Sequence, residues 1–227
     1  MIASTGPRNS SIDLAAAAEH NIEVTWALIL ASARNLIVET ASVRSGGWQR
    51  TPGDGIRGKV QGVLGLRNIG SEVARIGRAF GMDVVAWSQH LEPEKAKERG
   101  ARWVSKEELF RQADILTIHL VLSSRTRGLV GKPELGLMKP SANLVNTSRG
   151  PIVDEAALVE VLLKRHIACA AIDVFDVEPL PQGHALRQLD NVVATPHIGY
   201  VSRDLYRVLY QDTVANIAGW LQRRPRL

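Results

Sequence analysis

Short apolar runs alternate with longer amphipathic segments along most of the chain. From about Gly58 onward, runs of β-branched and apolar residues are followed by stretches whose apolar residues recur at helical spacing. This alternation is typical of βαβ units that feed a parallel sheet. The pattern therefore predicts an α/β fold with a doubly wound parallel sheet. Strands are expected over residues 59–66, 83–88, 101–105, 114–120, 142–148, 168–175 and 191–196.

Two segments between these strands carry clear helix signals. In residues 68–81 the apolar residues recur every three or four positions, and Gly81 ends the pattern. Residues 154–166 begin at Asp154, an acidic residue suited to an N-cap. Both helices are predicted to pack on the sheet. The face of the first helix is formed by Ile69, Val73, Ile76 and Phe80.

Helical patterns also flank the sheet region. Residues 25–48 read as one long helix that ends at the pair Gly46 and Gly47, before the turn-rich loop "QRTPGDGIRG". Residues 202–221 have apolar residues at helical spacing and are predicted to pack back on an upstream element. We therefore divide the chain into three parts. They are residues 1–48, residues 49–200 with the sheet, and residues 201–227.

Composition and charge narrow the class of protein. The chain has 227 residues, 45% hydrophobic and 22% charged, with a net charge of +5 and a single cysteine. No apolar run reaches the roughly 20 residues of a membrane span, and no leader pattern opens the chain, so a cytoplasmic location away from membranes is predicted. Basic residues are interspersed with acids, which argues against nucleic acid as a partner and suits a small anionic ligand. No metal site is expected from the spacing of cysteine and histidine.

The stretch "GVLGLRNIG" joins a predicted strand to a predicted helix through a glycine turn. Gly65 and Gly70 stand at the first and third glycines of a GxGxxG pattern, and the helix begins near Asn68 and Ile69. A tight turn followed by a helix N-terminus presents free amides and positive dipole to a diphosphate. A Rossmann-type dinucleotide site, for NAD or NADP, is therefore predicted here.

Arg67 occupies the middle position of this pattern, where backbone must approach the pyrophosphate. A Cβ at this position obstructs that approach, and the position often requires a conformation that only glycine adopts cheaply. We therefore favour the interpretation that Arg67 is a lesion in the turn. In the alternative, its guanidinium swings outward and pairs with a phosphate.

Ser88 ends the second predicted strand, where an acidic residue would bind the adenosine ribose of NAD. The surrounding letters "WSQH" contain neither an acid nor an arginine. NAD and NADP therefore both remain open, and Ser88 is either a ribose contact or simply the end of a strand.

Polar residues follow three consecutive strands at their carboxyl ends. They lie in "NTSRG", "DVFDVEP" and "TPHIG". Open α/β sheets place their ligands at this edge, so we predict a common site there. Its members are Arg149, Asp173, Glu178 and His197.

These motifs resemble the D-isomer-specific 2-hydroxyacid dehydrogenase family, in particular its glyoxylate/hydroxypyruvate reductase and phosphoglycerate dehydrogenase branches. The resemblance rests on "TGPRNSSIDLAAAAEHNI", "TWALILASARNL", "GVLGLRNIGSEVARIGRAFGMDVVAW", "HLVLSSRTRGLVG", "LMKPSANLVNTSRGPIVDEAALVEVL", "AAIDVFDVEPLP" and "NVVATPHIGY". It implies that Arg149 binds the carboxylate and keto oxygen of a small 2-keto acid. It also implies that His197 is the acid/base, with Glu178 holding its imidazole.

The resemblance also assigns cofactor and assembly residues. Asp173 would accept from the nicotinamide carboxamide, and Gly199 would lie near the same ring. Thr147 and Leu120 would line the cofactor groove with backbone, and Thr126 would contribute to it. A homodimer is expected through the helix region of residues 25–48.

Four departures from the family pattern leave two hypotheses. By this resemblance, residues 1–48 hold only a remnant of the family's substrate domain together with its hinge and dimerisation helix. A strand and loop would be missing between "EHNI" and "TWALIL", and Arg67 and Cys169 stand where the family has glycines. One hypothesis is an NAD(P)-dependent oxidoreductase that interconverts a small 2-keto acid and its D-2-hydroxy acid. The other is a catalytically impaired remnant that binds dinucleotide weakly or pairs with a full-length relative.

Overall fold

The structure is a computed structural model, and it describes residues 14–223. Within this part of the chain one sheet is formed by parallel strands in the order β3-β2-β1-β4-β5-β6-β7. The predicted α/β class and the predicted strands are confirmed, but each strand is shorter than expected because flanking turn residues leave the ladder. The strands are β1 (Val60–Leu64), β2 (Asp83–Trp87), β3 (Arg102–Trp103), β4 (Ile115–Ile118), β5 (Asn143–Asn146), β6 (Cys169–Ile172) and β7 (Val192–Ala194).

The strand order reverses at β1, which pairs with β2 on one side and with β4 on the other. The chain therefore winds outward from β1 in two directions. In open sheets of this kind a crevice forms outside the carboxyl ends of the strands at the reversal, and ligands bind in it. All the predicted site residues follow strands at this edge of the sheet.

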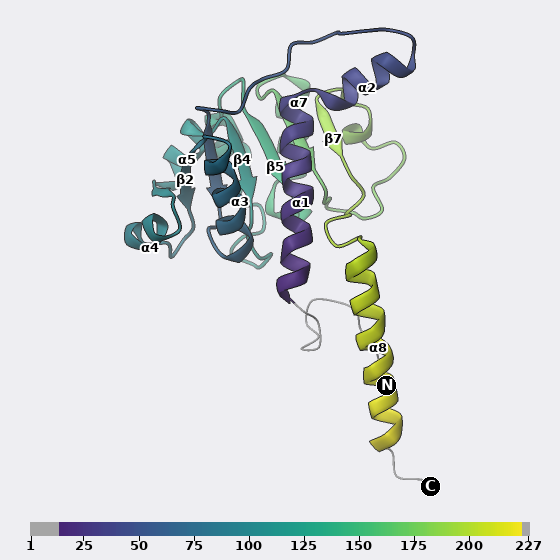
Figure 1. Cartoon of the computed structure of the whole chain (residues 1–227). Coiled ribbons are helices and arrows are strands. Elements are labelled where there is room, and N and C mark those ends of the chain that lie inside the picture. The colour runs from purple at the N-terminus through teal and green to yellow at the C-terminus, as the bar shows by residue number, and fades with distance from the viewer. Residues whose placement is uncertain (1–13, 224–227) are drawn as a thin grey trace.

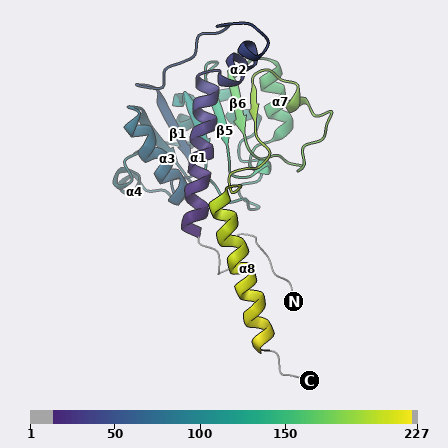
Figure 2. The ribbon, with the colours of Figure 1, turned by 45° about the vertical axis from the view of Figure 1, so that its right-hand side comes forward.

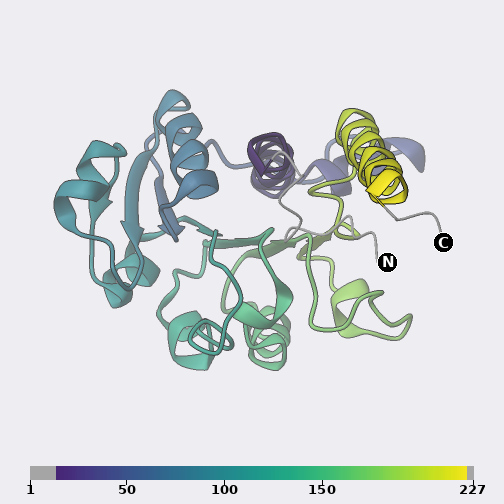
Figure 3. The ribbon, with the colours of Figure 1, turned by 90° about the horizontal axis from the view of Figure 1, so that it is seen from below.

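Helices cover both faces of the sheet (Figure 3). Helices α1 (Leu14–Ala33) and α3 (Asn68–Ala79) lie on one face, and α5 (Lys106–Gln112), α6 (Lys132–Leu137) and α7 (Glu155–Leu163) lie on the other. The N-cap Asp154 accepts from the backbone N–H of Ala157 at 3.1 Å, which confirms the predicted start of α7. The remaining elements are α2 (Leu36–Arg44), α4 (Pro93–Glu98), α8 (Arg203–Arg223) and the 3-10 helices η1 (Gly150–Ile152) and η2 (Ala185–Arg187).

Alternate residues along each strand point to opposite faces of the sheet, so the core has two layers. Leu64, Leu116 and Leu144 pack with residues of α5, α6 and α7 on one face. On the other face Ile115 and Val145 pack with Trp26 of α1 and Val73 of α3. Each fully buried large apolar side chain contributes on the order of 1.5–3 kcal/mol. Helix α1 therefore shares a core with the sheet.

The prediction of one continuous helix over residues 25–48 is wrong. The structure breaks it at Asn35, whose φ of 51° is left-handed, so that α1 ends at Ala33 and α2 begins at Leu36. The Asn35 amide donates to Thr51 Oγ1 at 3.1 Å and to the carbonyl oxygen of Pro52 at 3.2 Å. Tertiary contacts with a later loop thus stabilise a break that helix periodicity does not reveal.

Helix α1 is continuous across the junction between "EHNI" and "TWALIL". The segment "TGPRNSSID" of the family resemblance, residues 5–13, lies outside the described residues. At the opposite end of the chain, α8 confirms the helix predicted over residues 202–221. It begins near the carboxyl ends of the strands and extends away from the sheet (Figures 1 and 2). None of the helices in the described range is long and apolar enough to cross a membrane.

Candidate active site

Two glycines make the turn between β1 and α3 possible. Gly65 has a φ of 105°, and a Cβ on it would stand 2.5 Å from the carbonyl oxygen of His119. A Cβ on Gly70 would overlap the carbonyl oxygen of Gly65. Only glycine fits both positions, so the chain can turn tightly enough to aim the N-terminus of α3 at the crevice. The binding of a diphosphate at this turn stays a prediction.

Arg67 is the N-cap residue of α3, with φ −102° and ψ −153°, and its side chain is exposed. This extended conformation is open to any L-residue. The expectation of a conformation that only glycine adopts is therefore wrong at this position, whereas the obstruction of a diphosphate by its Cβ remains a prediction. A further arginine, which sequence analysis did not single out, lies beside the turn: the guanidinium of Arg99 donates to the carbonyl oxygen of Leu66.

Three further predicted cofactor residues lie on loops at the same edge. Ser88 follows β2 and is level with Gly65, because Trp87 pairs with Leu64. The side chain of Leu120 packs against the Gly65 turn, where its Cδ2 would be 2.9 Å from an added Cβ. The Thr126 hydroxyl donates to the Val121 carbonyl oxygen at 2.7 Å, so it braces its own loop.

His197 and Glu178 form the central pair of the site. The imidazole Nδ1 of His197 lies 2.6 Å from Glu178 Oε2, and the backbone N–H of Phe175 donates to Glu178 Oε1 at 2.9 Å. The side chains are 27% and 36% exposed, so the pair stays accessible to a ligand. A carboxylate on Nδ1 fixes the orientation of the ring and leaves Nε2 free to exchange a proton. The predicted contact between these two residues is present.

Asp173 organises the turn that presents His197. Its buried Oδ1 accepts from Thr195 Oγ1 at 2.6 Å and from the backbone N–H of Ile198 at 2.9 Å. Its Oδ2 accepts from the backbone N–H of Gly199 at 2.9 Å. These bonds hold His197 at a φ of 55°, a left-handed conformation that non-glycine residues adopt mainly where the surroundings impose it. This structural role of Asp173 was not predicted.

Arg149 is exposed and lies at the N-cap of η1, on the loop after β5. Asn146 holds that loop, because its Nδ2 donates to the Arg149 carbonyl oxygen at 3.0 Å and its Oδ1 accepts from the N–H of Ser148 at 3.0 Å. A Cβ on Gly150 would overlap the carbonyl group of Phe175. The loop of Arg149 therefore touches the loop of Glu178, backbone to backbone.

Helix α1 reaches the same end of the sheet through polar contacts that sequence analysis missed. The hydroxyl oxygens of Thr25 and Thr147 are 2.7 Å apart and buried. Asn21 Nδ2 donates to the carbonyl oxygen of Thr147 at 3.3 Å. The sequence indicates these contacts only through the spacing of Asn21 and Thr25, which are four positions apart and so share a helix face.

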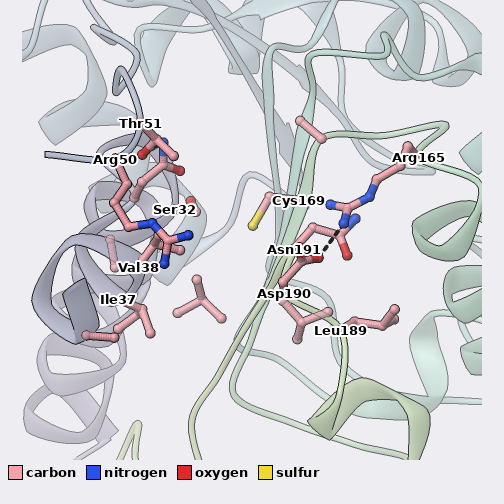
Figure 4. A pocket seen from close by; sticks show the side chains of 16 residues that line it. Ser32, Ile37, Val38, Arg50, Thr51, Arg165, Cys169, Leu189, Asp190 and Asn191 are labelled. Carbon is pink, nitrogen blue, oxygen red and sulfur yellow. Dashed lines mark hydrogen bonds and ion pairs between the residues drawn. The ribbon is translucent and has the colours of Figure 1, made fainter. Parts of the chain in front are cut away.

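Two other titratable groups, His119 and Cys169, have pKa values shifted by burial. Burial lowers the pKa of His119 to about 3, which keeps that imidazole neutral. Burial raises the pKa of the Cys169 thiol to about 11. Cys169 lines a pocket of about 720 Å³ between α2 and the amino ends of β6 and β7, opposite the predicted site. In this pocket Arg165 forms an ion pair with Asp190, facing Ile37 and Val38 (Figure 4).

Comparisons with known proteins point to one family. Residues 26–199 match the family model of the D-isomer specific 2-hydroxyacid dehydrogenase, NAD binding domain. A glyoxylate reductase of Aeropyrum pernix is 44% identical over 213 residues, which are 90% of this chain and 64% of that enzyme. The chain thus spans less than two thirds of that relative.

Solved structures give the same result. A phosphoglycerate oxidoreductase from Vibrio cholerae has a TM-score of 0.87 and 35% identity, and the match covers 91% of this chain and 68% of that one. A D-lactate dehydrogenase from Aquifex aeolicus, complexed with NAD and lactic acid, has a TM-score of 0.80 and 26% identity. That match covers 90% of this chain and 67% of the dehydrogenase.

Proposed function

Because the chain belongs to the D-isomer specific 2-hydroxyacid dehydrogenase family, we propose that it interconverts a small 2-keto acid and its D-2-hydroxy acid. The observation that carries this proposal is the contact of 2.6 Å between His197 and Glu178 at the carboxyl end of the sheet. The family model is that of an NAD binding domain, so a nicotinamide dinucleotide is its cofactor. Consumption of NADH or NADPH with glyoxylate or hydroxypyruvate tests the proposal.

Apart from Arg67, the residues of the turn between β1 and α3 fit such a cofactor. Gly65 and Gly70 leave no space for a Cβ, as the tight turn and the close helix packing of a dinucleotide site require. A bound NADH or NADPH supplies the hydride. In the proposed reaction the exposed Arg149 guanidinium binds the carboxylate of the keto acid as a planar fork. His197 Nε2 gives a proton to the keto oxygen, and Glu178 stabilises the imidazolium before that transfer.

Substitution Arg67→Gly is expected to tighten the binding of NADH about 10-fold, because it removes a Cβ and a long side chain from the approach to the α3 N-terminus. Titration calorimetry of both variants with NADH and NADPH measures the change. Arg75→Ala is the matched control, since Arg75 lies on the exposed side of the same helix and pairs with Glu72 at 2.7 Å. Weaker binding of NADPH to Arg67→Gly would instead identify Arg67 as a phosphate ligand.

Arg67 also supports a second candidate function, a catalytically impaired remnant that binds dinucleotide weakly or pairs with a full-length relative. An arginine at the middle position of the turn weakens the case for an efficient cofactor site, although the paired His197 and Glu178 are in place. This alternative predicts weak binding of NADH or NADPH and no consumption of either with a 2-keto acid.

We also propose that the chain forms a homodimer through the region of residues 25–48. Apolar side chains are exposed there, with 48% of Leu36, 58% of Ile37, 57% of Val43 and 74% of Trp48 accessible. Apolar residues gathered on one exposed segment are typical of an interface. Light scattering is expected to give twice the mass of the chain, and Ile37→Asp is expected to shift it to the monomer. A monomeric mass for the parent chain would refute the proposal.

A further inference from the structure

Asn21 places an amide side chain among the residues that the sequence assigns to the nicotinamide. Its Nδ2 donates to the carbonyl oxygen of Thr147 at 3.3 Å. A Cβ added to Gly199 would stand 3.6 Å from Asn21 Cγ and 3.7 Å from its Oδ1. Thr147 follows β5, and Gly199 follows β7. One side chain of α1 therefore reaches the loops after two strands at the ligand-binding edge of the sheet.

The oxygen of this amide lacks a donor. Asn21 Oδ1 is buried and accepts no hydrogen bond from any residue that the structure describes. The contact with Thr147 assigns the amide atoms, because a carbonyl oxygen only accepts and so the nitrogen must face it. Oδ1 is therefore the atom directed away from Thr147. A buried acceptor without a donor is costly, and a ligand that brings an N–H recovers that cost.

A second acceptor faces the same place. Asp173 Oδ2 would be 3.3 Å from a Cβ on Gly199. It already accepts from the backbone N–H of Gly199 at 2.9 Å, and a carboxylate oxygen has a further lone pair. Two acceptors beside one glycine suit a ligand nitrogen that carries two hydrogens. A primary carboxamide, such as the one on a nicotinamide ring, has such a nitrogen.

Building on the proposed function, we propose that Asn21 is a cofactor-binding residue of this chain. Its Oδ1 accepts one N–H of the nicotinamide carboxamide, and Asp173 Oδ2 accepts the other. Asn21 lies in "EHNIEVTW", where the sequence departs from the pattern it resembles. The continuous helix over that junction brings the amide to the site.

The test separates the carboxamide from the rest of the cofactor. Titration calorimetry of the full chain compares NAD with 3-acetylpyridine adenine dinucleotide, in which a methyl group replaces the carboxamide nitrogen, and with ADP-ribose, which has no ring. Asn21→Ala is expected to weaken NAD binding about 3- to 10-fold, the loss typical of one hydrogen bond. Binding of the acetylpyridine analogue and of ADP-ribose is expected to stay the same.

The control variant is Ser32→Ala. It removes the hydrogen bond of 3.3 Å from Asn143 Nδ2 to Ser32 Oγ, at the other end of the contact between α1 and β5. It should leave the ratio of NAD to analogue affinity unchanged. If Asn21→Ala does not bind ADP-ribose, Asn21→Leu takes its place, because leucine keeps the branched shape of the side chain and removes its polar atoms. It is expected to show the same selective loss.

The other possible outcomes contradict either the inference about Asn21 or the proposed function. An equal loss for NAD and the analogue, no loss, or tighter NAD binding in the Asn21 variants overturns the inference alone, provided that ADP-ribose still binds. Absence of ADP-ribose and NAD binding to the parent chain overturns the proposed function, and the inference falls with it.

Discussion

Replacement of His197 by asparagine is expected to lower kcat for the reduction of a 2-keto acid by about 1,000-fold or more, as loss of the general acid does in other enzymes. Asparagine is the appropriate replacement because the residue has a φ of 55°, which asparagine tolerates better than most residues. Its short amide keeps a polar side chain in the turn but cannot deliver a proton. The rate of NADH consumption at saturating substrate measures the effect.

Two further measurements, the affinity for NADH and the thermal stability of the variant, are the controls for this experiment. Asp173 continues to hold the turn through the backbone N–H groups of Ile198 and Gly199, so neither quantity should change by much in His197→Asn. Glu178→Gln keeps an acceptor for the N–H of Phe175 but loses the charge beside the imidazole, so we expect a smaller loss of kcat. A His197→Asn variant that retains more than about a tenth of the parent kcat would show that another group supplies the proton.

Replacement of Gly150 by alanine is expected to lower the free energy of unfolding by about 3 kcal/mol. The added Cβ would overlap the carbonyl group of Phe175 and stand 2.6 Å from the backbone nitrogen of Asp176. Backbone atoms cannot give way as the end of a flexible side chain does, so the two loops must separate. Urea denaturation followed by circular dichroism measures the change.

Gly136→Ala is the matched control. Gly136 lies on the exposed side of α6, and an added Cβ there meets no atom within 4 Å. Alanine should stabilise this helical position by up to about 1 kcal/mol. Equal midpoints for the two variants would show that the loop after β5 does not depend on close backbone contact with the loop after β6. The Gly150→Ala variant should also lose turnover, since Arg149 moves with its loop.

The sequence was sufficient for features whose signals are local. Alternating apolar runs predicted the strands, and the glycine spacing around Gly65 predicted the tight turn between β1 and α3. The pairing of His197 with Glu178 was also predictable, because both follow strands that end at one edge of the sheet and the family resemblance assigned their contact.

Features set by distant contacts were not predictable. The helix break at Asn35 depends on Thr51 and Pro52, which a periodicity window does not include. The left-handed conformation of His197 depends on the carboxylate of Asp173, more than twenty positions earlier. The contact between Asn21 and Thr147 joins residues 126 positions apart. A regular helical pattern gives no reason to distinguish this asparagine from any other polar residue.

Because α1 is one continuous helix, it connects two distant regions of the molecule mechanically. With 20 residues at about 1.5 Å of rise each, it is about 30 Å long. Asn21 on one part of it touches the loops at the carboxyl ends of the strands, and Ser32 near its other end lines the pocket beside α2. A helix resists compression along its axis, because its hydrogen bonds run in that direction. A sliding displacement of α1 would therefore shift both regions together and by the same length.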